Sequence, residues 1–278
     1  MNIIEFTALV CACSILAGFV GSLTGLGGGI IITPVLTLVL GVDIRYAIGA
    51  SLVSVIATSS GAAAAYVREG FSNIRIGMFL EIATTFGALA GALLAARVST
   101  GSISIIFGLA LLYSAYVSSR SRRGRGDERR PNPLATRLKM NGSYPTPAGP
   151  KGYCPHAVPA GFSMMFGAGV LSGLLGIGSG ALKVIAMDQI MGLPFKVSTT
   201  TSNFMIGVTA AASAGVYLSR GYIDPGLAAP VMLGVVAGSI AGARLLAEAK
   251  TKWLRLVFGV VIAVMAFEMI YHGVTGRL

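Results

Sequence analysis

The chain repeats itself, because residues in its first half recur without gaps 151 positions later. The clearest match sets the glycine cluster Gly25–Gly29 against Gly176–Gly180. Other identical pairs keep the same offset: Gly18 and Gly169, Gly41 and Gly192, Ser51 and Ser202, Tyr66 and Tyr217, Gly87 and Gly238, Gly91 and Gly242. A duplicated, glycine-interrupted pattern of membrane length is typical of secondary transporters, whose substrate sites lie where the two copies meet.

The composition explains why these repeats belong in a membrane. Hydrophobic residues make up 54% of the chain and charged residues only 11%, whereas a soluble domain carries about 25% charged residues. Uncharged stretches at 6–24, 46–67, 101–119 and 197–218 each approach the ~20 residues that cross a bilayer. Helices satisfy their own backbone hydrogen bonds in lipid, so the sequence predicts an all-α integral membrane protein.

The positive charge of the chain is concentrated in one place. Of the 21 Lys and Arg residues, nine lie between Arg120 and Lys151. This pattern indicates a cytoplasmic loop beside an anionic leaflet and argues against a nucleic-acid partner. The sequence contains no ATP-binding motif and no metal-ligand cluster, so we expect no cofactor. It also shows no nucleophile or acid–base constellation, which argues against an enzyme.

Each half divides into five apolar segments joined by a polar linker. The segments cover 6–24, 30–40, 46–67, 76–96 and 101–119, then 157–175, 181–191, 197–218, 226–247 and 253–272. We therefore predict a first membrane repeat at 1–119, a basic cytoplasmic linker at 120–156 and a second membrane repeat at 157–278. The linker is rich in Arg, Pro, Gly and Ser, so we expect it to be mobile and without regular structure.

The second segment of each half is too short to cross a bilayer. Eleven helical residues rise only ~16 Å, and the segment follows directly after the glycine cluster. The pattern predicts a helix broken within the membrane or a re-entrant hairpin with the glycines at its tip. If the hairpin counts as two passes, the halves are inverted. Outside the linker, inverted repeats place seven Lys and Arg residues on the cytoplasmic side and four on the outer side, and parallel repeats place four and seven. Cytoplasmic loops carry the excess of Lys and Arg. We therefore predict inverted repeats with both termini outside.

The glycine clusters are the first candidate substrate-binding residues. Glycine lets a ligand or another helix approach the main chain closely. Thr33 and Pro34 predict a helix start whose free N–H groups point at the first break, which would form an anion site. Close helix packing is the alternative role of these glycines. The candidates around the two breaks are Gly25, Gly27, Gly28, Gly29 and Thr33, and Gly176, Gly178, Ser179 and Gly180.

Polar and charged residues in the apolar segments complete the candidate site. A polar run opens the third segment of the second half and contributes Thr201, Ser202 and Asn203, and Ser51 is the counterpart of Ser202. These side chains donate hydrogen bonds to a substrate, or alternatively to backbone carbonyls.

Ionisable residues within a membrane are functional candidates by default. Lys183 follows the second cluster and is placed to face an anion, although a structural pair with Asp188 is the alternative. Glu81 and Asp188 are candidates for binding a coupling cation.

These motifs together resemble the sulfite exporter TauE/SafE family. The resemblance covers nearly the whole chain except the linker. In the first half it rests on the segments 18–21, 25–29 and 33–36. In the second half it rests on 176–180, Lys183, 192–194 and 201–210. Three features depart from the family pattern. Ser179 stands where a glycine is usual, Ile185 and Met187 stand in the second half where the first half has Pro34 and Leu36, and the basic linker is unusually long.

The resemblance implies a multi-pass transporter of prokaryotic plasma membranes. Family members are linked to small sulfur-containing anions, such as sulfite, sulfoacetate and related organosulfonates, usually as exporters. An anion channel and a cation-coupled importer of a small anion or metabolite remain alternatives. The expected partners are a small anionic solute and the lipid bilayer, and a homodimer is left open.

Overall fold

The computed structural model describes residues 3–24, 29–68, 72–119, 133–146, 149–246 and 251–276. The helices of the first half are α1 (Ile3–Thr24), α2 (Gly29–Pro34), α3 (Ile44–Arg68), α4 (Ile74–Ala95) and α5 (Thr100–Ser119). The linker holds α6 (Pro133–Arg137) and the strands β1 (Gly142–Thr146) and β2 (Gly149–Tyr153). The second half holds α7 (Val158–Leu175), α8 (Gly180–Ile185), α9 (Phe195–Ser219), α10 (Pro225–Leu246) and α11 (Thr251–Thr275).

Every predicted apolar segment corresponds to a helix, which confirms the all-α membrane part of the fold. The short second segment is a helix in both halves, and both copies end in a π-helical turn, η1 (Val35–Val39) and η2 (Ala186–Ile190). Among the described helices, α4 and α7 are long and apolar enough to cross a membrane by length and composition.

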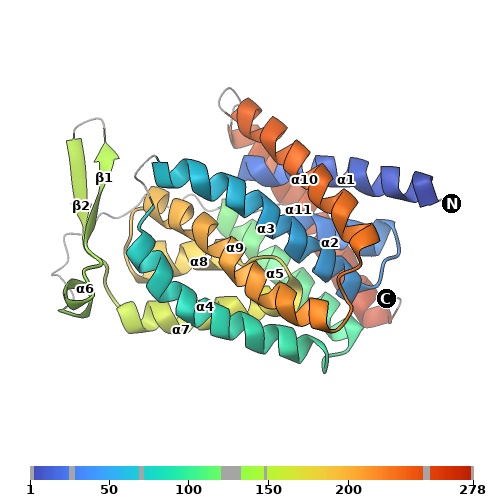
Figure 1. Ribbon diagram of the computed structural model, residues 1–278, viewed down its shortest axis with the longest axis horizontal. Coiled ribbons are helices and arrows are strands. Elements are labelled where there is room, and N and C mark those ends of the chain that lie inside the picture. The colour runs from blue at the N-terminus through green and yellow to red at the C-terminus, as the bar shows by residue number, and fades with distance from the viewer. Residues whose placement is uncertain are drawn as a thin grey trace.

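The long helices pack in pairs that join the two halves of the chain (Figure 1). Helix α1 lies on α10 and α4 lies on α7, while α3 contacts α9 and α5 contacts α11. Helix α1 begins and α11 ends at one end of the bundle, and α6, β1 and β2 lie at the opposite end. The core of the protein therefore lies between the halves rather than within either one.

Glycines bring the paired helices into backbone contact. A Cβ atom at Gly87 or Gly91 on α4 would collide with backbone atoms of α7, and one at Gly238 on α10 with the carbonyl of Ile15 on α1. Small residues allow this approach in membrane helices. Close helix packing therefore explains Gly87, Gly91 and Gly238, and Gly242 lies outside the residues whose surroundings are described.

The expectation of a linker without regular structure was wrong for residues 133–146 and 149–153. The strands form an antiparallel hairpin in which Gly142 faces Tyr153. Ala135 and Met140 are buried in the same cluster as Met187 and Met191 of the second half. Composition missed this structure because a few apolar side chains, docked on the end of the bundle, stabilise a segment that is otherwise polar.

Asn73 attaches the hairpin to the bundle. Its Oδ1 accepts a hydrogen bond from the Ile76 N–H and so caps α4, while its Nδ2 donates to the Tyr153 hydroxyl at 2.8 Å and the Met140 carbonyl at 3.2 Å. Burial is the main effect on the Tyr153 phenol and raises its pKa, so the phenol stays neutral near pH 7. The backbone N–H of Asn73 donates to Thr201 Oγ1 at 3.0 Å, which links the linker to α9.

Candidate functional site

The chain is interrupted at the second glycine cluster, as predicted. Helix α7 ends at Leu175 and α8 begins at Gly180. Between them, Gly176, Gly178 and Ser179 have positive φ angles of 67°, 69° and 45°, a conformation that glycine adopts without strain and serine does not. In the first half α1 ends at Thr24 and α2 begins at Gly29, and Gly25, Gly27 and Gly28 lie outside the described residues.

Ser51 on α3 connects the two breaks. Its hydroxyl lies 3.1 Å from the Gly29 carbonyl and 3.0 Å from the Gly176 carbonyl, so one proton is shared between acceptors from both halves. The counterpart Ser202 on α9 donates to the Gly180 carbonyl at 3.2 Å. Both hydroxyls therefore donate to backbone carbonyls here, which was the alternative role considered for them.

The glycines at the breaks also serve close packing. A Cβ atom at Gly29 would lie 2.5 Å from Val55 Cγ2, and one at Gly178 or Gly180 would lie 2.7 Å from the side chain of Ile206. These distances are shorter than side-chain contacts allow, so a larger residue at these positions would push Val55 or Ile206 aside.

The predicted helix start at Thr33 was wrong. Helix α2 begins at Gly29 and contains Pro34 at its end, so Thr33 caps no helix. Its carbonyl accepts the Thr37 hydroxyl, and its own hydroxyl is buried. Pro34 lacks an N–H and crowds the preceding turn, and the chain widens into the π-helical turn η1 directly after it.

The main polar feature near the second break is a buried ion pair between the two halves. Lys183 on α8 is 0% exposed and Glu81 on α4 is 7% exposed. Lys183 Nζ lies 3.9 Å from Glu81 Oε2. From the sequence, Lys183 was predicted as an anion ligand and Glu81 as a coupling group, and the two were not predicted to pair. The alternative partner of Lys183 was Asp188, which lies in η2.

Threonine hydroxyls connect the two charges. Lys183 Nζ donates to Thr209 Oγ1 on α9, and Thr209 donates to Glu81 Oε1 at 2.6 Å. Thr85 donates to the same carboxylate oxygen at 3.3 Å, and Thr84 lies 3.5 Å from Thr209. We call these five residues the Lys183–Glu81 cluster. The threonines of the cluster were not predicted from the sequence. Thr84 and Thr85 follow Glu81 by three and four residues, so they lie one helical turn from it on α4.

The cluster leaves strong hydrogen-bonding capacity unused. An ammonium group has three N–H donors, and within the described residues Lys183 Nζ makes one hydrogen bond, to Thr209. Glu81 Oε2 is buried without a hydrogen-bond partner in the same part of the chain, as are Ser179 Oγ and Thr33 Oγ1. Buried polar atoms are normally paired, so the unused hydrogen-bonding capacity of Lys183 and Glu81 makes the cluster a candidate site for a polar ligand.

The internal repeat does not supply a second copy of this ion pair. The positions 151 residues away from Lys183, Glu81 and Thr84 hold Ile32, Met232 and Val235. Ile32 is buried and apolar. The cluster is therefore a departure from the internal repeat.

The polar run of α9 serves several contacts. Thr201 accepts the Asn73 N–H, Ser202 contacts the break, and Thr200 donates back to the Lys196 carbonyl at 3.0 Å. Asn203 is half-buried. Only Ser202 in this run is brought to the glycine break by a hydrogen bond among the described contacts.

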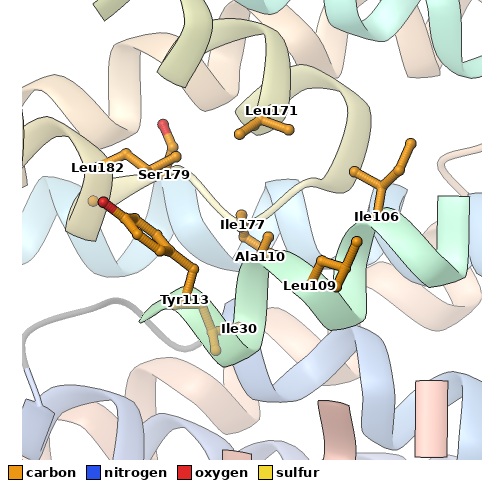
Figure 2. A pocket seen from close by; sticks show the side chains of 10 residues that line it. Ile30, Ile106, Leu109, Ala110, Tyr113, Leu171, Ile177, Ser179 and Leu182 are labelled. Atoms are coloured by element: carbon orange, nitrogen blue, oxygen red, sulfur yellow. The ribbon is translucent and has the colours of Figure 1, made fainter. Parts of the chain in front are cut away.

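A cavity of about 370 Å³ lies beside the second break. Ile177, Ser179, Gly180 and Leu182 line one wall, and the rest is formed by α2, α5 and α7. Figure 2 shows Ser179 and Tyr113 at the end near Leu182, with apolar side chains along the remainder. Ser179 lies four residues before Lys183. It is the polar side chain that the break contributes to the lining of this mainly apolar cavity.

Comparison with known proteins gives matches along most of the chain. Residues 10–269 match the family described as "Sulfite exporter TauE/SafE". The chain is 27% identical over 268 residues to "Probable membrane transporter protein YunE" of Bacillus subtilis (strain 168), covering 94% of this chain and 96% of that protein.

Two further relatives carry similar names. A second protein of the same strain, "Probable membrane transporter protein YdhB", is 26% identical over 83% of this chain and 84% of its own. A "Probable membrane transporter protein" of Xylella fastidiosa (strain 9a5c) is 26% identical over 92% of both chains. No solved structure matches this chain significantly.

Proposed function

Because the chain belongs to the sulfite exporter TauE/SafE family of membrane transporters, we propose that it exports a small sulfur-containing anion across a prokaryotic plasma membrane. The family match confirms the resemblance seen in the sequence and assigns the chain to a transporter family rather than an enzyme family. The proposed substrates are sulfite, sulfoacetate or a related organosulfonate. The observation that carries the proposal is the buried Lys183 ammonium with unused hydrogen-bond donors.

Lys183 favours an anionic substrate because burial of a cation within a membrane is expensive and marks a transport path. Its ammonium group is 0% exposed, and the carboxylate that balances it lies at 3.9 Å, beyond hydrogen-bond distance. A sulfonate or sulfite oxygen would accept the unused N–H donors. The Ser179 hydroxyl, in the break directly before the helix of Lys183, offers a further donor.

The helix pairing supports two repeats related by a two-fold axis, an arrangement that inverted and parallel repeats share. Helix α1 lies on α10 as α7 lies on α4, and these two pairs exchange under the 151-residue offset. The pairs α3–α9 and α5–α11 each join a helix to its own counterpart. A two-fold axis between the halves accounts for all four pairs, and inverted-topology repeats place the substrate site at that interface.

The second hairpin supports inverted rather than parallel repeats. The His156 N–H donates to the Met191 carbonyl at 2.8 Å, so the end of η2 lies beside the start of α7. The segment α7–α8–η2 therefore returns to the side on which it began. Each half then crosses the membrane an odd number of times, which inverts the second half relative to the first. With the basic linker in the cytoplasm, both termini face outward, and a strong cytoplasmic signal from a reporter fused to the C-terminus contradicts this arrangement.

The membrane potential favours export. An inside-negative potential drives anions outward by ~2.3 kcal/mol per charge per 100 mV, so export runs without ATP. Import of the same anion would require a co-transported cation. A channel shares the anion site but opens to both sides at once.

The test uses the purified protein in liposomes, with radiolabelled sulfoacetate as the probe. Wild-type protein should give saturable uptake that unlabelled internal sulfoacetate accelerates, which separates a carrier from a channel. Lys183→Met should lower the initial rate at least tenfold, and Lys196→Met, a change to an exposed lysine at the start of α9, should not. Uptake no faster than in protein-free liposomes, also with sulfite and thiosulfate, contradicts the proposal, as does full activity of Lys183→Met.

A further inference from the structure

We infer that Glu81 couples transport to protons, one proton bound for each anion bound. This inference rests on the proposed function. In the empty transporter the Glu81 carboxylate balances Lys183. When a substrate anion takes the place of that carboxylate beside the ammonium, Glu81 binds a proton and becomes neutral, and the anion and the proton cross the membrane together.

The two oxygens of Glu81 have different surroundings. Oε1 is held by the hydroxyls of Thr209 and Thr85. Oε2 faces Lys183 at 3.9 Å and has no hydrogen-bond partner among the described residues. The oxygen that faces the ammonium is therefore the one with unused capacity to bind a proton, and in this inference an anion oxygen takes its place beside Lys183 Nζ.

The charge balance of the site requires the proton. The empty cluster is neutral, since it holds one ammonium and one carboxylate. An anion bound without a proton leaves a net negative charge in a buried site, where isolated charges are strongly disfavoured. Binding one proton at Glu81 removes one negative charge. A monovalent anion then leaves the site neutral again, and a divalent anion such as sulfoacetate leaves one negative charge rather than two.

The helices packed against Glu81 offer no other balancing charge. Helix α7 carries no ionisable side chain, and α8 contributes Lys183. On α9 the ionisable residues are Lys196 and Tyr217, which lie near opposite ends of the helix, far from Thr209. Arg75, on the same helix as Glu81, is exposed and donates to the Lys139 carbonyl at 3.4 Å.

The internal repeat argues against a purely structural pair. The counterparts of Lys183 and Glu81 are Ile32 and Met232, so the equivalent helices pack with apolar residues at these positions. A buried ion pair is often no more stabilising than well-packed apolar residues. The fold therefore does not demand the pair, and the absence of a repeat-related counterpart for it indicates a role in transport.

Coupling changes what drives the transporter. A divalent anion with one proton still crosses with one net negative charge, so the membrane potential continues to drive it outward. A monovalent anion with one proton crosses with no net charge, so only the anion and proton gradients act on it.

The test measures accumulation of labelled sulfoacetate by liposomes that contain wild-type protein, with the voltage held at zero by potassium and valinomycin. A tenfold inward proton gradient should concentrate the probe about tenfold. With one proton carried per anion and no voltage, net uptake stops only when the anion gradient balances the proton gradient. Uptake that only equilibrates overturns the coupling and leaves the proposed function standing. No uptake above protein-free liposomes overturns the proposed function itself.

Two variants assign the proton to Glu81. Glu81→Gln should still equilibrate the probe but lose the tenfold accumulation, and accumulation like that of wild type overturns the inference. Glu268→Gln is the matched control, because Glu268 also pairs with a basic residue within a helix, His272 at 3.6 Å, but is exposed. It should accumulate the probe as wild type does.

A milder variant covers the case in which Glu81→Gln does not fold. Thr209→Val removes a hydrogen bond that stabilises the charged carboxylate, so uptake should become half-maximal at a higher pH. Thr58 is the counterpart of Thr209, and its hydroxyl makes the same bond to the carbonyl four residues back. Its described hydrogen bonds go to the Ser54 and Val55 carbonyls and not to the cluster. Thr58→Val should leave the pH profile unchanged, and an unshifted profile in Thr209→Val overturns the role of Glu81.

Discussion

The Lys183–Glu81 pair should show strong energetic coupling in a double-mutant cycle. The cycle compares wild type with Glu81→Gln, Lys183→Met and the double variant. Each single change leaves one charge buried without its partner, whereas the double change leaves none. The stability lost by the double variant should therefore be much smaller than the sum of the two single losses.

The magnitude follows from the geometry. Unit charges 3.9 Å apart attract by about 4 kcal/mol at the effective dielectric constant of about 20 that suits protein sites. Removing one partner of a buried pair costs about 3–5 kcal/mol. We expect each single variant to lose about that much and the coupling energy to exceed about 2 kcal/mol.

The assay is reversible unfolding in detergent micelles, followed by circular dichroism at pH 8 and pH 5. Lys183→Met should lose less stability at pH 5, because a proton then neutralises the abandoned Glu81 carboxylate. If each single variant loses less than about 1 kcal/mol of unfolding free energy and the two losses add in the double variant, the two charges do not interact. That result would refute the assignment of a buried ion pair.

Three other predictions test the surrounding structure. Gly173→Ala should cost about 1–3 kcal/mol, because its Cβ would collide with the Ala88 backbone on α4; Gly167→Ala on the same helix meets nothing within 4 Å and should be neutral or slightly stabilising in the same unfolding assay. Asn73→Ala should cost about 0.5–2 kcal/mol through the lost helix cap and should speed proteolysis of the β1–β2 hairpin, and an unchanged cleavage rate would contradict its role in docking. Ser51→Ala should cost about 1–3 kcal/mol because two buried carbonyls lose their shared donor, and thermal unfolding like that of wild type would contradict this.

Prediction from the sequence was most accurate where the signal is local. The apolar segments matched the helices because segment length and interruptions by glycine, proline and charge act within a few residues. The break between α7 and α8 was visible for the same reason. The expectation at Thr33 failed because a Thr-Pro pair also fits the end of a short helix that widens into a π-helical turn. The prediction of an unstructured linker was wrong because the structure of this segment depends on its contacts with the bundle.

Sequence alone determined the membrane class, the helix segments and the glycine break of the second half, since each depends on composition and spacing along the chain. Only the tertiary structure brought Glu81 to Lys183, which lies on a helix of the other half, and placed Ser51 between carbonyls of both breaks. Such contacts depend on which helix faces pack together. That choice is made by backbone contact at glycines such as Gly87 and Gly238, and no local pattern records which partner each glycine will meet.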